Sequence, residues 1–243
     1  MIIESTKTVG EIALEQPQAT KVFEAMKIDY CCGGKQTLEE ACASAGVDVT
    51  QLMRTLEQVS QNEAHGDHSL EFQKASLTEL IGHILEKHHV YTKEQMVRLE
   101  PLIGKVISAH GFNHPELREI GEQFQQLCAD LKQHMFKEER ILFPYLVELD
   151  RSATQNRAAP LAPFGTVNNP IRVMMMEHET AGDLLRGLRT LSSDYSAPPD
   201  ACISYKTLYA ELEALEQDLH QHIHLENNLL FPRATELEVN VGR

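Results

Sequence analysis

Two segments of the chain repeat one another at a spacing of 88 residues, and this repeat limits the folds that the chain can adopt. The sequence KEERILFP at 137–144 resembles LENNLLFP at 225–232. Three pairs of polar residues match at the same spacing or at one residue more: His134 with His222, Glu138 with Glu226, and His89 with His178. Repeats of this kind indicate two copies of one structural unit. We expect two helical hairpins whose matching residues face a shared core.

Apolar residues recur at alternating steps of three and four, which is the period of a buried helix face. This pattern predicts four long helices, at roughly 77–100, 116–146, 170–192 and 201–231. The buried stripe of the second helix is predicted to comprise Ile120, Phe124, Leu127, Leu131, His134, Glu138, Ile141 and Tyr145. The chain is therefore predicted to be all-α, with a four-helix bundle in residues 76–243.

The first 62 residues are interpreted as a separate small helical domain. Capping boxes, in which a side chain at each end of a Thr-x-x-Glu sequence satisfies a backbone N–H group, occur at Thr8–Glu11 and Thr37–Glu40. A third capping box, Ser76–Glu79, opens the bundle. The polar stretch at 62–74 is interpreted as a linker between the two domains.

The stripes place two carboxylates, Glu138 and Glu226, in the core. An unpaired buried carboxylate costs several kcal/mol, and neither Lys nor Arg lies on these stripes. Histidine and bound cations remain as partners, which predicts a dinuclear metal site with six ligands: His89, His134, Glu138, His178, His222 and Glu226. A single core histidine is more often a satisfied hydrogen-bonding residue than a ligand, but two copies at a fixed spacing favour ligands.

Three other histidines and a second metal compete with this assignment. His88 neighbours His89, and the repeat spacing favours His89. His220 and His224 flank His222, leave the leucine stripe and are interpreted as solvated. Imidazole and carboxylate donors without thiolate suit iron better than structural zinc, with manganese as the alternative.

The motifs together resemble the iron–sulfur cluster repair di-iron proteins, the RIC family, whose bundle is hemerythrin-like. The matching sequences are DYCCGG at 29–34, HMFKEERILFP at 134–144, EHE at 177–179 and HIHLENNLLFP at 222–232. The resemblance implies two non-haem iron ions, a cytoplasmic setting, and repair of clusters damaged by nitrosative or oxidative stress. It also implies that the partners are proteins with damaged clusters, with nitric oxide as a further candidate.

Five more residues are candidates for a supporting role. Cys31 and Cys32 are favoured as a thiol pair for metal binding, redox exchange or docking; the alternative is a simple turn. Asp130, one turn before His134, could accept a hydrogen bond from that imidazole. Glu177 and Glu179, beside His178, could line access to the metals. A surface role is the alternative for all three acids.

The charge balance excludes two classes of partner. The chain has 22 Lys and Arg against 36 Asp and Glu, a net charge of −14, so neither nucleic acid nor an anionic membrane is expected. No leader or spanning segment is visible, and the five cysteines do not describe a disulfide framework. A cytoplasmic monomer or homodimer is expected.

Three functions share these ligands. The favoured one is repair, by supplying iron or electrons, which requires no conventional turnover. The enzymatic alternative is a di-iron reductase of nitric oxide or peroxide. A sensor of oxygen or nitric oxide is less favoured, because no signalling motif accompanies the bundle.

Overall fold

The computed structural model describes residues 4–62 and 69–241, and within these ranges it contains helices and turns but no strand. The chain forms two compact units. The bundle unit comprises His83–Pro144 and Asn169–Leu219, and the composite unit comprises the residues up to Gly82 with Tyr145–Asn168 and His220–Arg243. The all-α fold class is confirmed. Among the described residues, none of the helices combines the length and the apolarity needed to traverse a bilayer.

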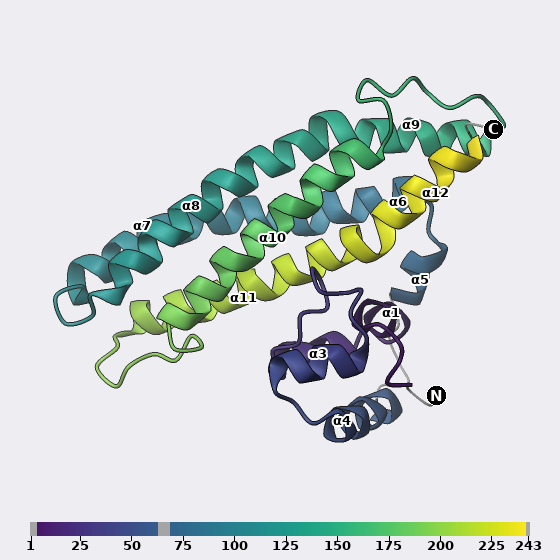
Figure 1. Ribbon diagram of the computed structural model, residues 1–243. Coiled ribbons are helices and arrows are strands. Elements are labelled where there is room, and N and C mark those ends of the chain that lie inside the picture. The colour runs from purple at the N-terminus through teal and green to yellow at the C-terminus, as the bar shows by residue number, and fades with distance from the viewer. Residues whose placement is uncertain (1–3, 63–68, 242–243) are drawn as a thin grey trace. The chain divides into compact units, whose positions relative to one another are not determined.

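Four long helices run side by side in the bundle unit (Figure 1). They are α7 (Val90–His110), α8 (Glu116–Lys137), α10 (Asn168–Leu191) and α11 (Ile203–Leu225), the last of which continues into the composite unit. Their apolar faces form one core, in which Leu99, Phe124, Leu185 and Leu208 are almost completely buried. Each such side chain contributes about 1.5–3 kcal/mol through burial. The four predicted helices are therefore present.

The first helix extends beyond its predicted end. We expected it to stop near residue 100, before Pro101, but α7 continues to His110 with Pro101 inside it. A proline inside a helix costs about 3 kcal/mol because it lacks an N–H group. Ile103 and Val106 are buried beyond it, and their burial offsets that cost.

Wider π-helical turns interrupt the long helices at three places: η1 (Ile84–His89), η2 (Glu138–Leu142) and η3 (Glu226–Leu230). Because η2 and η3 begin at the two matching glutamates, the repeat extends to the backbone. A π-turn holds one residue more than an α-turn, so it moves later residues to another face of the helix. The expectation that Ile141 is buried was wrong for this reason: it is 46% exposed, whereas Leu142 is 1% exposed.

Short helices make up most of the composite unit. They are α1 (Val9–Glu15), α2 (Ala19–Ala25), α3 (Leu38–Ala45), α4 (Val49–Asn62), α5 (Ser69–Lys74), α6 (Leu77–His83), α9 (Phe143–Thr154) and α12 (Phe231–Val241). The three predicted capping boxes are confirmed by reciprocal hydrogen bonds at Thr8, Thr37 and Ser76. Phe23, Leu38 and Leu52 anchor its core.

The predicted linker at 62–74 is wrong in its second half. Residues 63–68 lie outside the described residues, but Ser69–Lys74 forms α5, and the side-chain amide of Gln73 donates a 2.6 Å hydrogen bond to the carbonyl of Leu14. That contact holds α5 against α1. The domain boundaries proposed from the sequence, 1–62 and 76–243, stay a prediction.

Because of the π-turn at η2, alanine substitutions at the neighbouring residues Ile141 and Leu142 are expected to lower the free energy of unfolding by different amounts. Leu142→Ala is expected to lower the free energy of unfolding by about 2–5 kcal/mol, because it leaves a cavity in a packed core. Ile141→Ala should cost about 1 kcal/mol or less, because half of that side chain faces solvent. Denaturant titration of both variants measures the difference. Equal costs, or a larger cost for Ile141→Ala, would contradict the register described above.

Candidate metal centre

Four of the six predicted ligands lie together in the bundle unit. Glu138, at the start of η2, is completely buried, and His89, His134 and His178 are at most 4% exposed. The Oε1 atom of Glu138 lies 3.2 Å from Nε2 of His134, and its Oε2 atom lies 3.4 Å from Nε2 of His89. The Nε2 atoms of His134 and His178 are 3.1 Å apart. The Glu138 carboxylate therefore faces the imidazoles of His134 and His89, and the imidazole of His178 lies beside that of His134.

These separations fit donors around a metal ion. Ligand atoms at about 2.1 Å from one ion lie about 3.0 Å apart at a right angle and about 3.4 Å apart at a tetrahedral angle. Neutral imidazole and carboxylate donors in a dry interior are the set that iron, manganese and zinc accept. The residues present fit a transition-metal ion.

The other two predicted ligands repeat this geometry in the composite unit. Nε2 of His222 lies 3.2 Å from Oε1 of Glu226, the same separation as in the pair His134 and Glu138. Both residues are buried, Glu226 completely. His222 follows the buried Leu219 by three residues on helix α11, so it continues the face that packs in the bundle.

A carboxylate on the next helix holds the outer nitrogen of His134. Glu177 on α10 accepts a 3.0 Å hydrogen bond from Nδ1 of the His134 ring, and it forms an ion pair with Lys137. The hydrogen bond from His134, together with Lys137, lowers the pKa of Glu177 to about 2 against the opposing effect of burial. An ionised carboxylate can only accept hydrogen bonds, so Nδ1 of His134 carries the proton. Nε2 of the same ring then keeps its lone pair for a metal. Asp130 instead accepts from the amide of Gln126, so the predicted contact with His134 is wrong.

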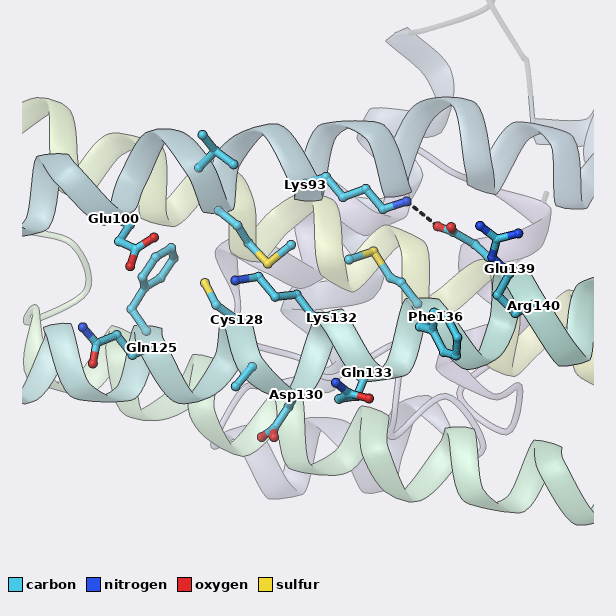
Figure 2. A pocket seen from close by; sticks show the side chains of 15 residues that line it. Lys93, Glu100, Gln125, Cys128, Asp130, Lys132, Gln133, Phe136, Glu139 and Arg140 are labelled. Carbon is cyan, nitrogen blue, oxygen red and sulfur yellow. Dashed lines mark hydrogen bonds and ion pairs between the residues drawn. The ribbon is translucent and has the colours of Figure 1, made fainter.

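A second carboxylate holds His89 in the same way. Glu139 accepts from Nδ1 of His89 at 2.8 Å and from Nζ of Lys93 at 2.5 Å. Burial acts to raise the pKa of Glu139, but the hydrogen bonds from Lys93 and His89 hold it below its ordinary value. Figure 2 shows Lys93 and Glu139 at one end of a cavity of about 850 Å³ lined by α7, α8 and the start of η2. Glu139 thus connects the wall of this cavity to a predicted metal ligand.

The rival histidines have other contacts. His88 is buried and its Nδ1 donates to Asp218 at 3.0 Å. His224 is also buried, and its Nδ1 lies 3.3 Å from the carbonyl oxygen of Tyr30; the prediction that it is solvated was wrong. Burial lowers the pKa of His224 to about 4. His220 is partly buried and contacts a carboxylate of α2 at 2.7 Å.

The predicted thiol pair lies on a loop of the composite unit between α2 and α3. Cys31 is buried and Cys32 is half-buried, and their sulfur atoms are 3.9 Å apart. All five cysteines lie in the part of the chain that the structure describes, and none of them forms a disulfide.

Glu139 and the π-turns are the features that the sequence did not reveal. The repeat offers no signal for Glu139, because Asn227 stands at the matching position. The two Glu residues at 138 and 139 could have been examined as ligand and supporting carboxylate, since histidine ligands commonly donate to a second carboxylate.

Comparison with known proteins agrees with this architecture. The family model for the hemerythrin HHE cation-binding domain matches residues 80–234, and that for a domain of unknown function, DUF542, matches residues 5–60. The iron–sulfur cluster repair proteins YtfE of Musicola paradisiaca and Edwardsiella ictaluri are each 36% identical to this chain over 228 residues. The match covers 94% of this chain and 96% of each relative.

The hydrogen bond from His134 to Glu177 predicts a loss of metal affinity when its acceptor changes. Glu177→Gln is expected to weaken metal binding about tenfold or more, because the amide no longer fixes the ring and its charge. Asp130→Asn is the matched control and should bind as the native chain does, since Asp130 contacts Gln126. Competition with a chelator measures both affinities. Equal affinities in Glu177→Gln and the native chain would show that Glu177 is only a surface acid.

Proposed function

Since the chain belongs to the hemerythrin HHE cation-binding family and to the family of iron–sulfur cluster repair proteins, we propose that it repairs damaged iron–sulfur clusters through a di-iron centre. The observation that carries this proposal is the complete burial of Glu138 between His89 and His134. A carboxylate in that position is stable when a cation compensates its charge.

We assign six ligands to the two iron ions: His89, His134, Glu138 and His178 of the bundle unit, and His222 and Glu226 of the composite unit. The two oxygens of Glu138 face different imidazoles, which supports its role as a bridge between two ions. The matching separation in the pair His222 and Glu226 supports the same role for Glu226. Manganese is the other metal that these donors suit.

When bound, two iron ions would supply the chain with a store of iron and of electrons. The chain's own residues keep that store away from water, and Glu139 and Glu177 orient the imidazoles that hold it. Lys93 and Lys137 keep both carboxylates ionised. We assign Cys31 and Cys32 to exchange or docking, because they lie on a separate loop in which Cys32 is half-buried and Asp29 is exposed.

The partners that follow are proteins whose clusters have been damaged by nitrosative or oxidative stress, with nitric oxide as a further ligand. We place this activity in the cytoplasm of the cell. The absence of any disulfide among the five cysteines supports a reducing compartment.

Removing the charge of either bridging carboxylate is expected to remove most of the metal. The native chain should contain about two iron ions, and Glu138→Gln or Glu226→Gln should each lose most of that iron, because the amide keeps the volume but not the charge. Glu216→Gln is the control, since Glu216 is also buried but pairs with Arg189 at 2.7 Å. Elemental analysis of the purified variants gives the result. Full iron content in either bridging variant would overturn the ligand assignment.

Repair itself is tested with the iron-loaded chain and a protein whose cluster nitric oxide has destroyed. We expect the client's cluster absorption and activity to return, and Glu138→Gln to be inactive. Consumption of nitric oxide without any recovery of the client would instead identify a reductase and contradict the proposal.

A further inference from the structure

The loop from Asp29 to Gly34 gathers three potential ligands outside the His and Glu centre. The ligand atoms of Asp29, Cys31 and Cys32 all lie within 4.8 Å of one another. We propose that these residues form a separate site for one thiophilic divalent cation, such as Fe²⁺. The existence of this cation site does not depend on the proposed function. Its use for iron exchange does rest on the proposed function, which the inference deepens.

The distance between the two thiols favours a shared cation over a disulfide. Their sulfur atoms are 3.9 Å apart, whereas a disulfide requires about 2.05 Å. Two thiolates at about 2.3 Å from one tetrahedral ion lie about 3.8 Å apart. The sulfur atoms of Cys31 and Cys32 are already at the separation that such an ion requires.

Asp29 holds the two cysteines in this arrangement. Its Oδ1 atom accepts hydrogen bonds from the backbone N–H groups of Cys31 and Cys32, at 3.1 and 2.9 Å, and from the Cys31 thiol at 3.3 Å. The carboxylate is exposed, so a cation can reach the loop from solvent. Three protein ligands leave a fourth position of a tetrahedral ion open, which is the property that distinguishes exchangeable sites from structural ones.

The loop is fixed on the segment that carries Glu226. The side-chain amides of Asn227 and Asn228 both donate to the carbonyl of Cys31, each at 3.4 Å. A methyl group at Gly34 would overlap the amide of Asn228, so glycine permits this close approach. Asn227 follows Glu226 directly in η3, so the thiols and a carboxylate of the proposed di-iron centre share one rigid support.

The charge balance of binding is simple. One divalent cation replaces two thiol protons, which pass to water, and two thiolates with one carboxylate then surround it. Because a metal ion displaces the protons of its thiol ligands, binding should release protons and weaken at low pH.

Cadmium titration of the full-length, iron-loaded chain under reducing conditions tests the site. Cd²⁺ is the probe, because thiolate-to-cadmium charge transfer absorbs in the ultraviolet and the His and Glu centre contains no thiolate. We expect the absorption to saturate at one Cd²⁺ per chain with release of about two protons. Cys31→Ser with Cys32→Ser should abolish it, and Asp29→Asn should raise the dissociation constant at least tenfold.

Cys202→Ser is the matched control, because Cys202 is exposed and lies on the other compact unit. It should leave the titration unchanged, and every variant should keep the iron content of the native chain. Absence of the band in the native chain, its persistence in the double variant, its loss in Cys202→Ser, or saturation at one Cd²⁺ per two chains would each overturn the site. Normal cadmium binding without client recovery in the repair assay would refute the proposed function and leave the site intact.

Discussion

A carboxylate with no access to water constrains the rest of this structure. Removing an ionised group from solvent costs several kcal/mol unless charge and hydrogen bonds compensate, and Glu138 is completely buried between two imidazoles. We assign that compensation to a metal cation, which needs histidines from different helices, and each ring must present its unprotonated nitrogen to the metal. Glu139 and Glu177 meet the second requirement from outside, and lysines keep them ionised. Carboxylates nearer the surface of the bundle therefore fix the orientation of the buried imidazole rings of His89 and His134.

Local patterns made most of the fold predictable. The four helices, the capping boxes and the repeat depend on residues three or four positions apart, and the sequence displays these directly. The positions of Ile141 and Leu142 could not be predicted, because an extra residue in a helical turn leaves no mark in the apolar period. The partner of His134 could not be predicted either, since Glu177 lies on another helix and Asp130 was the nearer acid in sequence.

The two copies of the repeat have diverged at one informative position. Glu139 follows the first of the two matching glutamates and accepts a hydrogen bond from His89, whereas Asn227 follows the second and donates to the carbonyl of Cys31. The next position differs as well, with Arg140 in one copy and Asn228 in the other. In the first copy, the residue after the matching glutamate therefore orients His89. In the second copy, the corresponding residue holds the loop that carries Cys31 and Cys32.

The composite unit is built from chain segments that are far apart in the sequence, and this has a consequence for synthesis on the ribosome. Its contacts join residues before Gly82 to residues after His220, with the bundle unit encoded between them. At about 5–20 residues per second, translation of the intervening segment takes roughly 7–27 s. During that time the loop with Cys31 and Cys32 lacks the two asparagines that donate to the Cys31 carbonyl, so the nascent chain completes the surroundings of its thiols only when η3 emerges.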